Sequence, residues 1–216
     1  MRARLIHGRA VELDVDDLRR RLAAPGPGAV LPGDPGMEQT NAALTPASVL
    51  MPIVERADEL MMLFTRRTAQ LRSHSGQISF PGGRAEPADP SPESTALRET
   101  HEEIGLAPDR VRLLGRLADY STRTGYRITP VVGAVAAPFE LRPYAGEVDE
   151  VFEVPLSFLL DPRNHLRHSR VFQGETRWFY AIPYRDYYIW GATAGMLVNL
   201  YRHLCYLDAS PGRSVS

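Results

Sequence analysis

The stretch that most constrains this chain runs from Gly82 to Leu106 and reads GGRAEPADPSPESTALRETHEEIGL. Its second half predicts a helix over residues 92–104. Ser91 is a good N-cap, Pro92 suits the first helical position, and Gly105 suits the stop. We therefore expect a rigid helix directly after a turn that is rich in Pro and Gly.

Three glutamates, Glu99, Glu102 and Glu103, lie within this predicted helix. Offsets of three and four residues place their carboxylates on one face. Like charges so placed cost an isolated helix about 0.2–0.5 kcal/mol per pair. A hard cation such as Mg²⁺ or Mn²⁺ reverses that cost, because it seeks carboxylate oxygens. For a bare E-x-x-E-E a solvated acidic face is the commoner alternative, so the flanking residues must decide.

The flanking residues resemble the Nudix box, G-x5-E-x7-R-E-U-x-E-E-x-G-U, in which U is apolar. The matching positions are Gly83, Arg98-Glu99, Glu102-Glu103, Gly105 and Leu106. Two positions depart from the pattern. Thr100 takes an apolar position, and Asp89 replaces the first Glu, with one extra residue between it and Arg98.

The segment just upstream, LFTRRTAQLRSHSGQISFPGG, narrows the resemblance. It is similar to the signature of the coenzyme A pyrophosphatase subfamily, L-L-T-x-R-[SA]-x3-R-x3-G-x3-F-P-G-G. The matching positions are Thr65, Arg67, Arg72, Gly76, Phe80, Pro81, Gly82 and Gly83. Phe64 and Thr68 are modest substitutions. The Asp and the extra residue in the box are also features of this subfamily, so they support the resemblance.

Strand-length apolar runs surround the predicted helix, which indicates a chain of mixed α and β structure. The expected strands cover 49–55, 59–67, 76–80, 111–122, 128–136 and the first half of 151–160, with a hairpin over 166–173 and 175–183. The second half of 151–160 and the stretch IWGATAGMLVNLYRHL, residues 189–204, are expected to be helical. The resemblance implies an α/β fold, the Nudix-type α/β/α sandwich with a mixed β-sheet.

The chain divides into three parts by composition. Residues 1–47 are expected to hold an N-terminal helix over 10–23 and an irregular Pro- and Gly-rich arm over 24–47. The arm could lie over the core or reach a second subunit. Residues 48–208 form the expected Nudix domain, and 209–216 an expected disordered tail.

Composition limits the partners. A net charge of −1 gives no reason to expect nucleic acid or an anionic membrane. The chain has no Lys, and an all-Arg set suits bidentate phosphate contacts, although genomic base composition explains it as well. The single Cys205 excludes an internal disulfide and a cysteine zinc cluster. With no signal-peptide core and no transmembrane run, a cytoplasmic enzyme is expected.

The resemblance implies roles for the box residues. Glu99, Glu102 and Glu103 would hold Mg²⁺ or Mn²⁺, and Gly83 would offer its backbone carbonyl. We expect Glu102 and Glu103 to be the principal ligands and Glu99 to be a ligand or the general base. Arg98 would orient a ligand carboxylate, since it stands four residues before Glu102 and within helical reach of it.

A further acidic ligand is expected from the loop AGEVDEVFEVPL. Glu147 is our choice, because Glu-Val shortly before Pro-Leu resembles the family's arrangement. Asp149 and Glu150 are the other candidates, and a solvated acidic loop is an equal alternative.

Four arginines flank the glycine turn and could bind the phosphates of a substrate: Arg66, Arg67, Arg72 and Arg84. Arg67 and Arg72 occupy signature positions. Arg66 occupies a variable one, so surface solvation is its alternative. The pair Trp178-Phe179 is typical of core or edge packing and is a weaker candidate for contacts with adenine or an acyl chain.

The leading prediction is metal-dependent hydrolysis of the diphosphate linkage of coenzyme A or acyl-coenzyme A, which gives 3′,5′-ADP and (acyl-)4′-phosphopantetheine. Two alternatives remain open. The same fold could hydrolyse ADP-ribose, NADH or a dinucleoside polyphosphate, or it could be a non-catalytic nucleotide-binding regulator. The expected partner is a small nucleotide, with no nucleic acid and no membrane, and a homodimer is compatible with the sequence.

Overall fold

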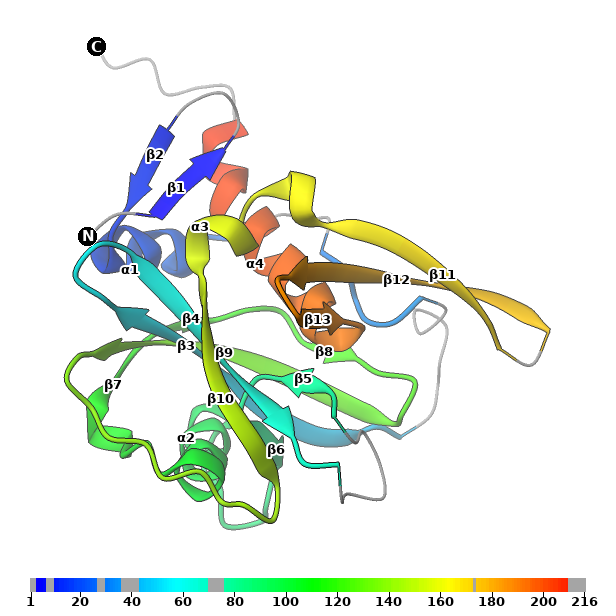
Figure 1. The fold of residues 1–216 in the computed structure, drawn as a ribbon, viewed down its shortest axis with the longest axis horizontal. Helices are drawn as coiled ribbons and strands as arrows, with labels where there is room; N and C mark the ends of the chain where they lie inside the picture. Colours follow the sequence, from blue (N-terminus) through cyan, green and yellow to red (C-terminus); the bar gives the residue numbers. More distant parts are fainter. Residues whose placement is uncertain are drawn as a thin grey trace.

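The computed structural model describes residues 3–6, 10–26, 30–35, 43–69, 76–172 and 174–209. Arg72, the hairpin tip at Gln173 and the tail from residue 210 lie outside these ranges. The α/β prediction is confirmed, since a mixed sheet lies between helices (Figure 1).

The centre of the molecule is an eight-stranded sheet in the order β10-β4-β3-β9-β7, with three short strands added to it. β3 and β9 pair in parallel along their whole length, and the other pairings are antiparallel. The strands are β3 (Thr45–Glu55), β4 (Leu60–Arg67), β5 (Ile78–Ser79), β6 (Gly82–Arg84), β7 (Val111–Arg116), β8 (Tyr120–Ser121), β9 (Tyr126–Ala136) and β10 (Val148–Pro155). The expected strand pair around residues 56–58 and the pair 111–122 with 128–136 are both present.

The sheet separates two apolar cores because side chains alternate along each strand. On β3, Met51 and Ile53 belong to the larger core, while Leu50 and Val54 belong to the smaller one. Helix α2 (Pro92–Ile104) packs on the smaller core. Helices α1 (Val15–Ala23), α3 (Leu156–Leu159) and α4 (Ala192–Ala209) pack on the larger core. The result is three layers.

A separate three-stranded sheet extends the larger layer. It consists of β11 (Leu166–Phe172), β12 (Glu175–Tyr184) and β13 (Tyr187–Trp190), all antiparallel. The predicted hairpin is therefore confirmed. The predicted final helix was wrong at its start, because Ile189 and Trp190 pair with β12 and the helix begins at Ala192. Gly191, with φ of 64°, makes this change of direction.

The N-terminal prediction was also wrong in part. Residues Ala10–Leu13 form strand β2, which pairs with β1 (Ala3–Ile6), and the helix begins only at Val15. Asp14 stops the strand and starts the helix, because its side chain accepts a hydrogen bond from the Asp17 backbone N–H in a capping box.

Of the Pro- and Gly-rich arm, residues 30–35 lie over the core. The Asn199 side chain of α4 bonds both backbone groups of Leu31, at 2.8 and 2.9 Å. The Asp34 backbone N–H donates to the Ser121 carbonyl at 2.8 Å. Within the described residues, no helix is long and apolar enough to cross a membrane.

Candidate active site

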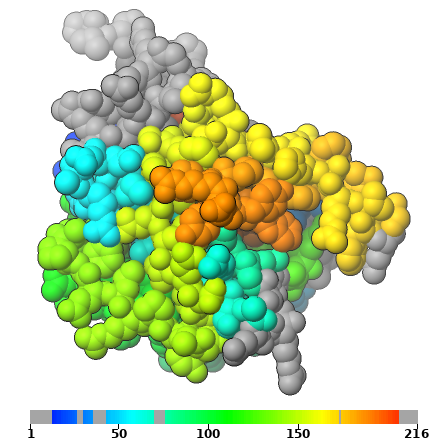
Figure 2. Space-filling model, in the orientation of Figure 1, coloured from blue at the N-terminus to red at the C-terminus, as the bar shows by residue number. Residues whose placement is uncertain are grey.

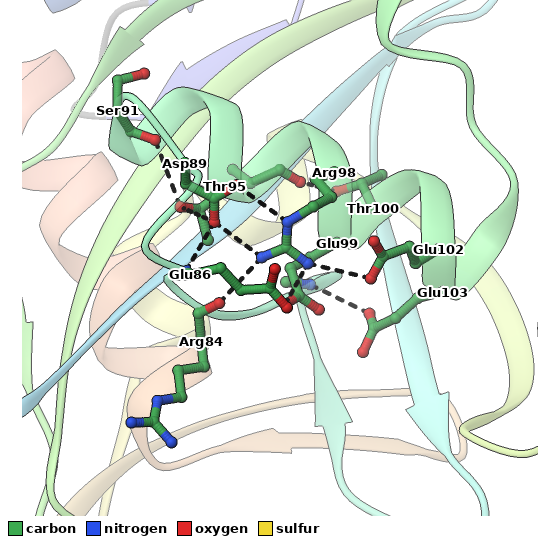
Figure 3. Close-up of polar contacts among 12 residues, drawn as sticks. Arg84, Glu86, Asp89, Ser91, Thr95, Arg98, Glu99, Thr100, Glu102 and Glu103 are labelled. Atoms are coloured by element: carbon green, nitrogen blue, oxygen red, sulfur yellow. Dashed lines mark hydrogen bonds and ion pairs between the residues drawn. The ribbon is translucent and has the colours of Figure 1, made fainter.

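Helix α2 forms as its sequence predicts. The Ser91 hydroxyl accepts from the Ser94 backbone N–H at 3.2 Å, and Gly105 closes the helix in the left-handed conformation at φ 70°. Ala96 and Ile104 are fully buried against the sheet. This packing fixes the rotation of the helix, so the side that carries Arg98 and the glutamates faces β6 and the solvent (Figure 3).

Arg98 is the centre of the polar contacts on this side (Figure 3). Its Nη1 donates to Glu99 Oε1 at 2.9 Å and to Glu102 Oε2 at 3.1 Å, so these two carboxylates are neighbours. Its Nη2 donates to the Arg84 carbonyl at 3.1 Å, which ties the helix to the end of β6. The orienting role expected for Arg98 therefore has a matching geometry.

Asp89 holds Arg98 from the opposite side. Its two oxygens accept from Arg98 Nε at 3.1 Å and from Nη2 at 2.9 Å. It also accepts from the Thr95 hydroxyl and the Glu86 backbone N–H, so it braces both the turn and the helix. The bond to Arg98 holds the pKa of Asp89 well below its usual range.

Glu103 is the most enclosed of the three glutamates, with 5% of its surface exposed. Its Oε2 accepts from the Gly82 backbone N–H at 3.1 Å, and its Oε1 lies 3.5 Å from Arg67 Nη1. Burial raises the pKa of Glu103 to about 7, against the opposing effect of the Gly82 bond. Glu102, by contrast, has 57% of its side chain exposed, so the three carboxylates share a side of the helix but not an environment.

Gly83 leaves room for the Glu99 carboxylate. A Cβ at residue 83 would stand 2.5 Å from Glu99 Oε2, so a larger residue there would displace this carboxylate from the β6 backbone. Burial also raises the pKa of Glu99. Gly82 is constrained as well, because its φ is 151° and a Cβ there would meet the Ser48 carbonyl at 2.4 Å.

The distal candidate Glu147 lies on the same side of the molecule. Its charge contributes to the raised pKa of both Glu99 and Glu103, and its carbonyl accepts from the Thr68 backbone N–H at 2.9 Å. Asp149 and Glu150 instead pair with Arg66, at 3.2 and 2.8 Å. Of the three acidic candidates in this loop, Glu147 is thus the one that acts on the box carboxylates.

A divalent ion fits these residues in chemistry. The donors are carboxylate oxygens, which Mg²⁺ and Mn²⁺ prefer, and Gly83 leaves open the space that a Cβ would fill beside Glu99. Within the described residues, no three acidic, His or Cys side chains already converge as a ligand set. Arg98 shares its Nη1 between Glu99 and Glu102, so an ion placed between those two carboxylates would replace an existing guanidinium contact.

A cavity of about 510 Å³ lies beside β6. Its lining includes Gly82, Gly83 and Arg84 of β6, which contacts α2, and residues 177–179 of β12 in the β11–β12 hairpin. Figure 2 shows this hairpin, in yellow and orange, standing out from the rest of the face. The three glutamates do not line the cavity themselves; they lie on the α2 side of β6.

The predicted phosphate-binding arginines separate into two groups. Arg67 and Arg84 line the cavity. Arg66 does not line it, because successive side chains of β4 point to opposite faces and Arg66 pairs with Asp149 and Glu150 of β10. Arg72 lies outside the described residues.

Several lining residues had no clear signal in the sequence. Arg123 comes from the loop before β9, Tyr126 from the start of β9, Arg177 from the hairpin, and Trp190 from the end of β13. The only available signal was the aromatic pair Trp178-Phe179, both of which line the cavity. These residues come from chain segments far apart in the sequence, and local sequence patterns do not predict such tertiary contacts.

The architecture is an α/β/α sandwich in which an acid-bearing helix lies against a short glycine strand beside a cavity. A family model described as "NUDIX domain" matches residues 44–173 of this chain. The chain belongs to the Nudix family, and it is a Nudix hydrolase.

Two relatives carry the name "Uncharacterized Nudix hydrolase NudL". The protein of Photorhabdus laumondii is 42% identical over 156 residues, which cover 71% of this chain and 82% of the relative. The protein of Yersinia pestis (strain Pestoides F) is 38% identical over 186 residues, which cover 86% of this chain and 89% of the relative.

Solved structures of other proteins are similar to part of this chain. A MutT/nudix family protein from Enterococcus faecalis is similar with a TM-score of 0.48 and 16% identity, over 78% of this chain and 64% of that one. The Nudix hydrolase RenU of M. smegmatis is similar with a TM-score of 0.45 and 23% identity, over 52% of this chain and 71% of that one.

Proposed function

We propose that this Nudix hydrolase cleaves the diphosphate linkage of coenzyme A or acyl-coenzyme A, in a reaction that depends on Mg²⁺ or Mn²⁺ and yields 3′,5′-ADP and (acyl-)4′-phosphopantetheine. The observation that carries the proposal is the junction of the two motifs. Arg67 of the upstream signature lies 3.5 Å from Glu103 of the box, and Glu103 in turn bonds the backbone of Gly82. The signature and the box thus build one site.

The chain's own residues supply positioning and charge. Glu99, Glu102 and Glu103, with the Gly83 carbonyl and Glu147 as further donors, would hold a divalent ion, which would supply charge neutralisation and a more acidic attacking water. Arg98 orients Glu99 and Glu102, and Asp89 orients Arg98. Glu99 or Glu102 accepts the proton of the attacking water.

The cavity would hold the rest of the substrate. Arg67 and Arg84 line it next to the glycine strand, so they are placed to contact the diphosphate oxygens of a bound nucleotide. We retain Arg72, a signature position, in the proposed substrate site and leave Arg66 out of it. Residues 48–208 as the catalytic domain, 1–47 as helix and arm, and a cytoplasmic location complete the proposal.

The deciding experiment is hydrolysis of coenzyme A with and without added Mg²⁺ or Mn²⁺, with both products identified. We expect 3′,5′-ADP and 4′-phosphopantetheine to form only when the ion is present. ADP-ribose, NADH and diadenosine polyphosphate are tested in parallel. Faster turnover of one of these would replace coenzyme A as the substrate, and no turnover of any would favour a nucleotide-binding regulator.

The variant Glu102→Gln tests the catalytic assignment. It keeps the side-chain volume and removes one anionic ligand, so we expect kcat to fall by about 100-fold. Glu93→Gln on the same helix is the matched control, because Glu93 pairs only loosely with Arg116, at 3.8 Å. Wild-type turnover in Glu102→Gln at saturating ion would remove Glu102 from the reaction.

A further inference from the structure

The hairpin side of the cavity carries a set of aromatic and basic side chains that the reaction at α2 does not use. Within the described residues, six of the nine exposed large apolar side chains lie on the three-stranded sheet: Leu166, Val171, Phe172, Trp178, Tyr188 and Trp190. Such a concentration of exposed aromatic surface is typical of a binding site.

The cavity reaches this sheet at an open edge. β13 pairs only with Ala181–Tyr184 of β12, so the earlier part of β12 has no neighbouring strand on that edge in the described chain. Arg177, Trp178 and Phe179, from this earlier part, line the cavity. The end of β13 and the start of α4 close it, where Gly191 N–H donates to the Tyr180 carbonyl at 3.1 Å.

Phe179 and Trp190 form an aromatic pair in the cavity, with ring centroids 5.5 Å apart, on the same face of β12 as Arg177. Trp178 lies on the opposite face, because successive side chains of a strand alternate. It is 45% exposed, and the Arg167 guanidinium lies 5.0 Å from its ring centroid. Nucleobases stack on such rings, because every base offers a π face.

Arg177 is positioned to bind an anionic group. Its guanidinium packs 4.2 Å from the Phe172 ring centroid, and its contact with Glu175 is long, at 4.0 Å. Among the described residues, buried side-chain polar atoms without a hydrogen-bond partner number two, Arg67 Nε and Arg177 Nε, and both arginines line this one cavity. Buried donors are normally satisfied, so each requires an acceptor that the described protein does not supply.

We propose that the hairpin side of the cavity binds the nucleoside half of the substrate, with the base against the Phe179–Trp190 pair and a phosphate carried on the ribose against Arg177, which lies on the same face of β12. This assignment rests on the proposed function for the identity of that phosphate. Arg67, which contacts Glu103, serves the diphosphate, so Arg177, the second arginine with a buried and unpartnered Nε, serves a second, separate anionic group.

A second copy of this chain is the competing occupant of the exposed aromatic surface. An apolar interface would cover Trp178 and Trp190, but it would leave the buried Arg177 donor without an acceptor. A ribose phosphate satisfies both the aromatic and the basic lining. Oligomeric state is therefore measured alongside binding.

The test is calorimetric binding of 3′,5′-ADP and 5′-AMP to the full chain, which needs no turnover. These two ligands differ only in the ribose 3′-phosphate. We expect the wild type to bind 3′,5′-ADP about tenfold more tightly, because a charge-assisted contact is worth about that factor. Arg177→Ala and the longer Arg177→Gln should both lose this preference.

Arg170→Ala is the matched control, since Arg170 lies directly across the β11–β12 ladder from Arg177 and does not line the cavity. It should keep the preference. Trp190→Ala should weaken both ligands equally, by about fivefold or more. Val171→Ala, on the same hairpin and outside the cavity lining, should bind both as the wild type does.

Equal wild-type affinity for the two nucleotides, or a preference that survives both Arg177 variants, would overturn the inference. So would a Trp190→Ala protein that changes oligomeric state with its nucleotide affinity intact. If the wild type releases 3′,5′-ADP from coenzyme A while Arg177 proves irrelevant, the proposed function stands and this assignment falls. If coenzyme A is not cleaved but Arg177 still selects 3′,5′-ADP, the reverse holds.

Discussion

The two sides of the cavity are built in opposite ways. On the α2 side, the Arg98 guanidinium donates five hydrogen bonds. Two go to Asp89, and one each to Glu99, Glu102 and the Arg84 carbonyl. On the hairpin side, Arg177 rests on Phe172 and keeps a buried donor without a partner in the described chain. The central guanidinium of one side is fully paired within the protein, and that of the other side is not.

This difference separates the chemistry from recognition. A hydrolytic centre gains from polar groups that are already oriented, because no reorganisation is then needed during the reaction. A binding surface gains from donors and rings that only the ligand satisfies, since that contrast supplies affinity and selectivity. Variants on the α2 side should therefore change kcat, and variants on the hairpin side should change binding.

The largest expected effect comes from Glu103→Gln. Glu103 is buried between Gly82 and Arg67, so the variant keeps the shape and removes a central charge. We expect kcat to fall by about 10²–10³-fold, while the affinity for 3′,5′-ADP changes by less than about twofold. Steady-state kinetics and calorimetry on the same preparation measure the two. A parallel loss of nucleotide affinity would show that the two sides are one unit.

A smaller effect is expected from Asp89→Asn, which weakens the support of Arg98 without touching the carboxylates. Residues that orient ligands typically contribute about 10–100-fold to activity, so kcat should fall by about tenfold. An unchanged kcat would show that Glu99 and Glu102 hold Arg98 without Asp89.

The Asp89→Asn variant should also differ from the wild type in how its stability changes at low pH. Because Arg98 lowers the pKa of Asp89 in the folded state, the stabilisation from Asp89 is fully present above the unfolded pKa of about 3.9 and is lost as pH falls through the lower folded value. The gap in melting temperature between wild type and Asp89→Asn should thus close as pH falls below about 4. A gap that stays constant down to pH 2 would contradict the assignment.

The same contrast explains what could be predicted from the sequence. Helix α2 was predicted with its caps, because Ser91, Pro92 and Gly105 act on their own neighbourhood. The role of Asp89 was not, since Asp89 in a Pro-rich turn has the composition of an ordinary turn former, and its bonds to Arg98 span nine residues. The family resemblance supplied the box residues, and the three-layer fold followed from it.

The cavity lining on the hairpin side could not be predicted from local sequence patterns. The cavity joins a loop at residues 122–126, a strand edge at 177–179 and the turn at Gly191, and only tertiary packing brings these together. The two boundary errors have the same origin. Pairing of residues 10–13 with β1 and of 189–190 with β12 overrides helical periodicity, because cross-strand hydrogen bonds outweigh propensity.

The smallest expected effect tests the boundary between the two sides and the rest of the surface. Arg66 and Arg67 are adjacent on β4, yet only Arg67 lines the cavity and approaches Glu103, while Arg66 pairs with Asp149 and Glu150. Arg66→Ala removes only exposed ion pairs, which are worth about 0–1 kcal/mol. We expect KM for coenzyme A to change by less than about twofold, against about tenfold for Arg67→Ala. Paired measurement of KM on the two variants decides it, and a large effect at Arg66 would extend the binding surface across β10.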